Sequence, residues 1–349
     1  MRTGAADCRA GAQLLTGGGV PSGARRRYFC TYFDSRYLSQ GLALYRSLLR
    51  HVGDFELWIL CLDQLAHDAL VALQLPQARL VSLDEFERGD YELLAAKSTR
   101  SNVEYFFTCT PSWPLYVLAH NEHIDVLGYL DADLYFYSSP ESVYEELGAG
   151  SLLITAHDFP SDLKRHERHG RFNVGLMLFR HDEPALAALS WWRERCLEWC
   201  YDRVEEGRFA DQKYLDQWPI LFPETRVMRK PAGAMAPWNW MNYEISWNRD
   251  HIVVNGERLV TYHFQSVSVY FGRLYVTQLS GFRRMPASLR RRLYGPYVSD
   301  LAFCGRLLRR ALGLRTWLAP TRARRPLTPK GLFKSWRSGD AGVSLRCRD

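Results

Sequence analysis

The chain has 349 residues, of which 47% are hydrophobic and 13% aromatic, so it can bury one large core or two smaller ones. It contains no run of 18 consecutive apolar residues, which argues against a membrane-spanning helix. The net charge of +7 is unevenly divided: residues 283–349 carry 17 Lys and Arg against three Asp and Glu, and the first 282 residues have a net charge of −7.

The N-terminal segment and the cysteines bear on the compartment. Residues 1–26 are rich in Gly and Ala and lack the apolar core of a secretory signal, so we expect a disordered leader. Several of the eight cysteines lie inside apolar runs, as Cys30 and Cys61 do, which is typical of buried free thiols. With no Asn-x-Ser/Thr sequon in the chain, these features predict a reducing cytoplasm.

Strand and helix signals alternate through the first half of the chain. Apolar, β-rich runs predict strands at 28–33, 55–62, 78–83, 126–131 and 151–156. Helical patterns separate them, and the helical pattern of 101–122 is interrupted by Pro111 and Pro114. The alternation predicts an α/β fold with a mixed, mostly parallel sheet flanked by helices. Sheets of this kind bind ligands at the carboxyl ends of their strands.

Further elements are predicted beyond this sheet: an apolar strand at 172–180, a Trp-rich helix at 183–203 and a strand at 258–264. At 286–314 an amphipathic helix carries an apolar stripe with arginines between its members. The stripe favours either an anionic lipid surface or packing against the body. We therefore divide the chain into a leader (1–26), a main domain (27–282), a basic helical extension (283–317) and a disordered basic tail (318–349).

The stretch YLDADLYF places Asp131 and Asp133 where the predicted strand 126–131 ends. The Asp-x-Asp pattern carries little weight alone, because Asp is common in this chain. Residues i and i+2 of an extended chain face the same way, so the two carboxylates could share a hard divalent cation. The alternative, a turn that caps the next helix, is better served by residues 138–140.

GYLDADLYFY resembles the strand-end Asp-x-Asp motif of nucleotide-sugar-dependent glycosyltransferases with the GT-A fold. The nearest group is that of family-8-like retaining enzymes and related bacterial nucleotide-diphospho-sugar transferases. Other stretches match in the same order: TYFDSRYLSQGLALYRSL the first strand and helix, FNVGLMLF the Asn-x-Gly segment, ADQKYLD an Asp-Gln pair, and YHF a late histidine. The resemblance runs from about residue 28 to residue 270 and implies a GT-A domain.

The resemblance implies a role for each matching residue. Asp131, Asp133 and His263 would bind Mn²⁺ or Mg²⁺, and Asp131 would also face the donor. Asn173 and Gly175 would lie beneath the donor sugar, with Asp211 and Gln212 near its anomeric carbon. Thr31, Asp34 and Tyr37 could hold the base and ribose, with plain turn and core roles as the alternative. Lys97 or Arg100 could reach the diphosphate as a cation, with a solvated surface charge as the alternative. The alternatives are a core or surface His263, a backbone partner for Asn173, and Asp211 as a helix cap.

Two features bear on the completeness of the site. The segment HFQSVSVYFGR has Ser266 where the family usually has Gly, and no Lys follows His263 closely; Arg273 is the available substitute. The polar loop FPSDLKRHERHGR is a candidate mobile lid, and Trp238, Asn239 and Trp240 are candidates for stacking on an acceptor sugar.

These features predict a cytoplasmic, metal-dependent glycosyltransferase that moves a hexose from a nucleotide-diphosphate sugar, UDP-linked, to a glycan or lipid-linked acceptor. Retention of configuration is implied by the family resemblance alone. The basic C-terminal region predicts peripheral contact with an anionic membrane at its inner face, and we expect no nucleic acid partner. One alternative is a non-catalytic glycan- or membrane-binding protein of the same fold. The other is a sugar-nucleotide pyrophosphorylase, but its Gly-rich phosphate loop would follow the first strand, whereas LLTGGGVPSGARRR precedes it.

Overall fold

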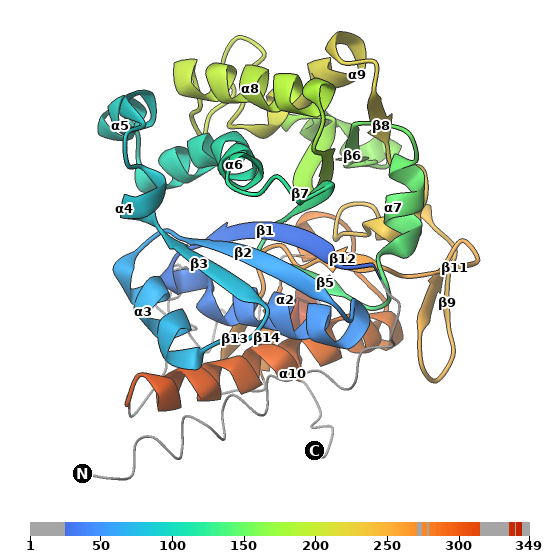
Figure 1. The fold of residues 1–349 in the computed structure, drawn as a ribbon. Coiled ribbons are helices and arrows are strands. Elements are labelled where there is room, and N and C mark those ends of the chain that lie inside the picture. The colour runs from blue at the N-terminus through green and yellow to red at the C-terminus, as the bar shows by residue number, and fades with distance from the viewer. Residues whose placement is uncertain (1–24, 271–273, 278, 315–334, 339, 344–349) are drawn as a thin grey trace.

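A central seven-stranded sheet organises the computed structural model, which describes residues 25–270, 274–277, 279–314, 335–338 and 340–343 (Figure 1). The strand order is β3-β2-β1-β4-β7-β6-β8. These strands are β1 (Arg27–Phe33), β2 (Phe55–Cys61), β3 (Ala78–Ser82), β4 (Val126–Leu130), β6 (Leu152–Ala156), β7 (Phe172–Arg180) and β8 (Thr225–Val227). Only β7 runs against the others in this sheet, which confirms the predicted mixed, mostly parallel α/β fold.

The position of β7 differs from the prediction that residues 172–180 lie beyond the sheet. The strand is inserted between β4 and β6 and pairs antiparallel with both. Its side chains from Val174 to Phe179 are buried, because a central strand is covered on both faces. Consequently the start of β7 meets the end of β4, and this junction builds the site described below.

Helices cover both faces of the sheet (Figure 1). On one face lie α2 (Leu38–His51), α3 (Gln64–Leu73) and α10 (Ala287–Ala311), and on the other α4 (Leu83–Phe86), α5 (Tyr91–Ser98), α6 (Asn102–Ala119) and α8 (Glu183–Glu198). The short helices α7 (Glu141–Leu147) and α9 (Trp218–Leu221) lie near β6 and β8. Each face therefore has its own apolar core.

Helix α6 is continuous, although Pro111 and Pro114 lie inside it. It begins with a capping box in which Ser101 and Glu104 satisfy each other's backbone N–H groups. The prolines remove N–H donors from the helix interior. Burial of Tyr105, Cys109 and Trp113 from the same helix provides the compensating packing.

Three smaller sheets, six 3₁₀ segments and a short helical segment at residues 335–338 complete the described structure. The sheets pair β5 (Leu134–Phe136) with β12 (Thr261–His263), join β9 (Ile245–Trp247), β10 (Ile252–Val254) and β11 (Glu257–Arg258), and join β13 (Ser268–Tyr270), β14 (Leu274–Val276) and β15 (Ala341–Val343). The 3₁₀ segments are η1 (Ser35–Tyr37), η2 (Ser161–His169), η3 (Gln212–Gln217), η4 (Pro231–Gly233), η5 (Trp240–Asn242) and η6 (Leu279–Gly281).

Two parts of the predicted C-terminal region are described. The apolar stripe of α10, including Leu289, Leu293, Tyr297 and Leu301, is buried in the body, so packing rather than a lipid surface covers it. In the tail predicted to be disordered, Ala341–Val343 pair with β14, and Gly342 lies close to the ring of Tyr275. Most of the predicted leader, residues 1–24, and residues 315–334 and 344–349 lie outside the described residues.

No helix in the described ranges combines the length and the apolar character needed to cross a membrane.

Candidate metal and substrate site

The first two acidic residues follow directly from the end of β4. Its buried run VLGYL ends at Leu130, where the backbone N–H of Asp131 donates to the carbonyl of Gly175 in β7 (2.8 Å). The chain then turns, with the N–H of Leu134 donating to the carbonyl of Asp131 (3.0 Å), and enters β5. This turn holds Asp131 and Asp133 at the carboxyl end of a central parallel strand.

His263 lies on β12, a strand that is distant in sequence from the two aspartates. Strand β12 pairs antiparallel with β5, which sets His263 opposite Leu134. The N–H of Phe264 donates to the carbonyl of Asp133 (2.8 Å) and fixes the register. His263 Nε2 lies 3.0 Å from Asp133 Oδ1 and 3.6 Å from Asp131 Oδ2. One ligand atom from each of the three residues lies within 4.8 Å of the other two.

Burial and charge both act on these groups. Burial raises the pKa of Asp131, and so does the neighbouring Asp133, against the opposing influence of His263 and of a hydrogen bond from Tyr129. Burial lowers the pKa of His263, but the two carboxylates outweigh it and leave that pKa above its ordinary value. Two ionised carboxylates that lie near each other repel, and a positive charge between them offsets this repulsion.

The donor set fits a divalent cation. Two carboxylate oxygens and one imidazole nitrogen converge, with side-chain exposures of 31% for Asp131, 14% for Asp133 and 11% for His263. Oxygen donors suit Mg²⁺ and Mn²⁺, and the imidazole favours Mn²⁺ of the two. The structure thus brings together the three residues that the sequence predicts as metal ligands.

Asn173 and Gly175 lie at the start of β7, beside this cluster. The amide oxygen of Asn173 accepts from the N–H of Gly175 (2.8 Å), and its Nδ2 lies 3.4 Å from Nε2 of the buried His157. The partners of the Asn173 amide are therefore within the protein. Gly175 lies where a β-carbon would stand under 3 Å from Asn173 and His263. Steric clearance alone explains this glycine.

Asp211 is buried close to the cluster. It precedes η3 without making a side-chain capping bond, so the N-cap alternative does not account for it. Burial, followed by the charge of Asp131, raises its pKa to about 7, against a hydrogen bond with Thr110 that lowers it. The neighbouring Gln212 donates from Nε2 to the carbonyl of His169 (2.9 Å), which ties it to the end of η2.

The residues predicted to hold the nucleoside are buried or already hydrogen-bonded within the protein. Thr31 has no exposed surface, and its buried hydroxyl finds no partner among the described residues. Asp34 caps η1 and accepts hydrogen bonds from the backbone (3.0 Å) and side chain (2.6 Å) of Arg36. Tyr37 is half-buried and packs against the core under α2. A nucleotide contact by Thr31 or Asp34 would need these arrangements to change.

The structure pairs Lys97, which was predicted to contact the diphosphate, with a carboxylate of the protein. Its Nζ donates to both carboxylate oxygens of the buried Glu87 (2.7 and 2.8 Å). Arg100, the alternative cation, donates to Thr108 (2.7 Å) and to the carbonyl of Leu197 (2.6 Å). Both cations therefore form hydrogen bonds that link α5, α6 and α8 to neighbouring parts of the chain.

The predicted lid and acceptor platform are packed together. Phe159, Leu163, Ala236 and Trp238 form a small apolar cluster in which η2 covers Trp238. The ring of Trp238 lies edge-on to His263, with centroids 5.3 Å apart. Trp238 and Asn239 are buried here, so neither presents a face to an acceptor in this conformation.

Ser266 has a positive φ of 62°, the left-handed conformation that favours glycine. The residue that replaces the usual family Gly thus keeps a backbone shape suited to Gly. Arg273, the proposed substitute cation, lies outside the described residues.

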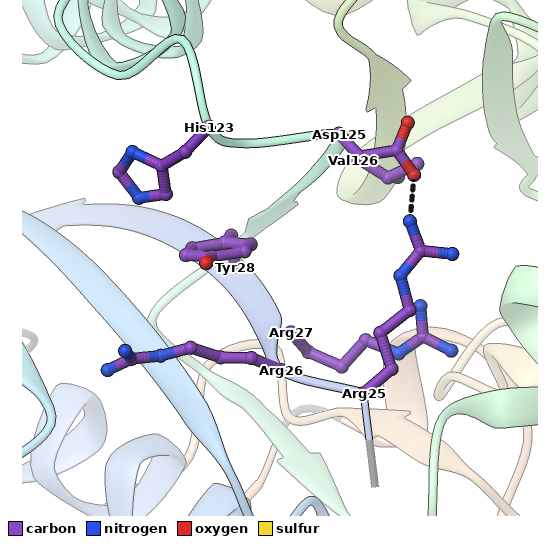
Figure 2. A pocket seen from close by; sticks show the side chains of 7 residues that line it. All are labelled: Arg25, Arg26, Arg27, Tyr28, His123, Asp125 and Val126. Atoms are coloured by element: carbon purple, nitrogen blue, oxygen red, sulfur yellow. Dashed lines mark hydrogen bonds and ion pairs between the residues drawn. The ribbon is translucent and has the colours of Figure 1, made fainter.

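A separate hollow of about 200 Å³ lies at the amino-terminal ends of β1 and β4, lined by residues 25–28, His123, Asp125 and Val126 (Figure 2). Because the strands are parallel, it lies at the opposite edge of the sheet from Asp131. Its arginines already pair with carboxylates: Arg25 with Asp125, Arg26 with Asp54 and Glu56, and Arg27 with Glu141.

Three residues that the sequence analysis missed lie near the acidic groups. The hydroxyl of Tyr129 donates to Asp131 Oδ1 (3.0 Å), and those of Tyr32 and Thr110 lie 2.8 Å apart beside Asp211. In the sequence, tyrosines within apolar strands and a threonine within a helix look like ordinary core residues. No motif could have identified them.

Comparisons with solved structures find glycosyltransferases of low similarity. The galactosyltransferase LgtC is 15% identical, covering 85% of this chain and 99% of that chain, with a TM-score of 0.47. Mouse xyloside xylosyltransferase 1 is 13% identical (69% and 98% covered, TM-score 0.44). GlyE of Streptococcus pneumoniae TIGR4 is 19% identical (58% covered, TM-score 0.37), and the match spans less than half of that chain, 45%. Because these TM-scores lie below 0.5, we do not transfer function from them.

Sequence relatives give a firmer result, although no family model matches the chain. The uncharacterized protein YfnF of Bacillus subtilis (strain 168) is 34% identical over 249 residues, covering 69% of this chain and 82% of YfnF. YfnD of the same organism is 30% identical over 245 residues, covering 69% of this chain and 78% of YfnD. The chain therefore belongs to the family of YfnF and YfnD.

Proposed function

We propose that the chain is a metal-dependent glycosyltransferase that moves a hexose from a UDP-linked sugar to an acceptor hydroxyl, with retention of configuration. The observation that carries this proposal is the convergence of Asp131, Asp133 and His263 at the carboxyl end of β4. That edge is where sheets of this type bind ligands. The order of motifs in the sequence, which resembles that of GT-A enzymes, supports the same reading.

Asp131, Asp133 and His263 would hold Mn²⁺ or Mg²⁺, with Mn²⁺ the better match to an imidazole ligand. When bound, such a cation would offset the negative charge of the donor diphosphate. The carboxylates themselves are partly exposed, so they can face a ligand, whereas the imidazole is fixed by the pairing of β12 with β5.

Asp211 would orient the donor sugar. Its pKa of about 7 allows the carboxyl group to donate a hydrogen bond to a sugar hydroxyl when protonated, or to accept one when ionised. Asn173 and Gln212 would contribute to the same surface. The amide of Asn173 already hydrogen bonds to Gly175 and His157, and that of Gln212 to the carbonyl of His169. In this proposal the departing diphosphate takes the proton of the acceptor hydroxyl.

The wider setting is proposed from charge and thiols. The arginines 291, 292, 306 and 310 lie exposed on α10, which would suit an anionic membrane surface and a lipid-linked acceptor. Six cysteines of the described residues are buried and free, which suits a reducing cytoplasm. We propose no nucleic acid partner.

A second candidate is a non-catalytic binding protein of the same fold. The observation that favours it is the commitment of Lys97 to Glu87 and of Asp34 to Arg36, which leaves the predicted nucleotide contacts engaged within the protein. Such a protein would bind a sugar nucleotide or a glycan without cleaving it.

The deciding experiment measures release of the nucleoside diphosphate from a panel of sugar nucleotides, with Mn²⁺ or Mg²⁺ and with EDTA. Asp133→Ala is the test variant. Asp125→Ala, which removes a carboxylate at the opposite edge of the sheet, is the control. We expect metal-dependent release by the wild type and the control, reduced at least about 100-fold in Asp133→Ala. Donor binding without release would favour the binding protein, and absence of metal binding by calorimetry would overturn both readings of the cluster.

A further inference from the structure

Two acidic residues on separate elements are joined by a series of three hydroxyl groups. Asp131 lies after β4 and Asp211 lies before η3. The hydroxyls belong to Tyr129 on β4, Tyr32 on β1 and Thr110 on α6. We call this set the hydroxyl series.

Two contacts of the hydroxyl series are direct hydrogen bonds. Tyr129 donates to Asp131 Oδ1 at 3.0 Å, and the hydroxyls of Tyr32 and Thr110 lie 2.8 Å apart. The ring of Tyr32 packs against that of Tyr129, with centroids 5.9 Å apart. Thr110 lies beside Asp211, whose pKa its hydrogen bond lowers. The series therefore sets one hydroxyl against each acid and connects the two through Tyr32.

Packing alone does not require these hydroxyls. Tyr129 is 1% exposed and Thr110 is fully buried, so a phenylalanine and a valine would fill nearly the same space without polar atoms to satisfy. Buried hydroxyl groups cost free energy unless they are paired. Here Tyr129 pairs with Asp131, and Tyr32 pairs with Thr110 beside Asp211, which indicates that the hydroxyls are retained for the two acids.

At Asp131, the hydroxyl series fixes the orientation of the carboxylate. Because Tyr129 engages Oδ1, the other oxygen, Oδ2, is the one that faces His263 at 3.6 Å. The carboxylate is thereby kept from rotating, and one defined oxygen is presented to the other ligands. Residues that orient metal ligands in this way typically change metal affinity 10–100-fold when mutated.

We propose that Tyr129, Tyr32 and Thr110 are positioning residues: Tyr129 orients the metal ligand Asp131, Thr110 orients Asp211, and Tyr32 packs between the two hydroxyl groups. This inference rests on the proposed metal site and on the proposed role of Asp211.

The first test measures Mn²⁺ affinity by calorimetry on the full chain. Tyr129→Phe removes only the hydroxyl and is expected to weaken Mn²⁺ binding about 10-fold or more. Tyr105→Phe is the matched control, because it removes a hydroxyl that donates to Glu87 (2.6 Å) away from the cluster, and its affinity should equal that of the wild type. Tyr32→Phe, one step further along, should weaken binding less than Tyr129→Phe.

Unchanged Mn²⁺ affinity in folded Tyr129→Phe and Tyr32→Phe would overturn the inference while leaving the metal site standing. Equal weakening in the Tyr105→Phe control would also overturn it, because the effect would then be one of general stability. If the wild type binds no Mn²⁺, the proposed metal site fails first, and the inference with it.

The second test addresses the Asp211 end through donor turnover. Thr110→Val removes the hydroxyl, and Thr110→Ser keeps it. We expect Thr110→Val to lower kcat with little change in KM for the donor, and Thr110→Ser to restore most of kcat. Equal losses in the two variants would show that Thr110 acts through packing, which would overturn its positioning role.

Discussion

The α-carbon of Gly175 lies directly against the imidazole of His263. A β-carbon added to Gly175 would stand 2.7 Å from His263 Nδ1 and 2.6 Å from Asn173 Oδ1. Real side chains do not approach this closely, so one of the two polar groups would have to move. Strand β12 can bring its histidine to the acidic pair because β7 has no side chain at this position.

Gly175→Ala is therefore expected to displace His263 and to weaken Mn²⁺ binding at least about 10-fold, with a loss of about 1–3 kcal/mol in the free energy of unfolding. Calorimetry and urea unfolding measure the two effects. Gly295→Ala is the control, because an added methyl group meets nothing within 4 Å there. Wild-type affinity in Gly175→Ala would show that the imidazole is not a ligand in this position.

The raised pKa of Asp211 predicts how stability depends on pH. The folded state holds its proton up to about pH 7, whereas the unfolded chain releases it near the ordinary value of 3.8. Between these values the unfolded state binds fewer protons, so the free energy of unfolding falls as pH rises, and above pH 7 the loss is complete. The full difference corresponds to roughly 4 kcal/mol, as an upper value.

Asp211→Asn removes this penalty. Urea unfolding in EDTA should show the variant gaining on the wild type progressively from about pH 4 to about pH 7, and keeping a constant advantage above that. Asp216→Asn, in η3 and paired with Lys213, should not show this trend. A constant difference between Asp211→Asn and wild type at every pH would contradict the assignment.

Lys97→Ala is expected to cost about 1–2 kcal/mol of stability, because it leaves the buried Glu87 with a hydroxyl partner but no cation. The half-exposed lysine keeps this value modest. Binding of a nucleoside diphosphate should be unchanged, as it should be in the exposed-lysine control Lys164→Ala. Loss of nucleotide binding at unchanged stability would restore the role in diphosphate binding that the sequence predicted.

Asp300→Asn tests how firmly α10 belongs to the body. The buried carboxylate accepts hydrogen bonds from Arg46 (3.2 Å), Arg50 (2.7 Å) and Tyr135 (2.9 Å), and so joins α10 to α2 and β5. We expect a loss of about 2–3 kcal/mol in urea unfolding, since two arginines lose their counter-charge. The neighbouring exposed residue gives the control, Ser299→Ala, which should be neutral. A neutral Asp300→Asn would mean that the apolar stripe alone attaches α10.

The strands could be read from the sequence because a strand covered on both faces forms an apolar run, as LWILC within β2 and VLGYL in β4 do. The order of the strands in the sheet could not be read from the sequence. Nothing in FNVGLMLFR shows that β7 enters between β4 and β6 and runs antiparallel to both. That insertion is what brings Asn173 and Gly175 beside Asp131.

The residues of the site also divide into those that the sequence could predict and those that it could not. Asp131 and Asp133 could be located from the rule that ligands bind at strand ends, but His263 could be named only through the family resemblance. The ion pair between Lys97 and Glu87 could not be predicted, because Glu87 lies on a neighbouring short helix turn and a lysine in an ion pair has no distinguishing sequence pattern. The hydroxyls of Tyr129 and Tyr32 were indistinguishable from core aromatics for a similar reason.

The late position of β12 has a consequence for synthesis. The ribosome releases the two aspartates long before it releases His263, and β5 has no β12 partner until then. In a nascent chain the proposed metal site is therefore incomplete, and it gains its third residue only after all seven strands of the central sheet have been made. Tight capture of the cation would then mark chains that have finished folding, and truncated translation products would leave it in solution.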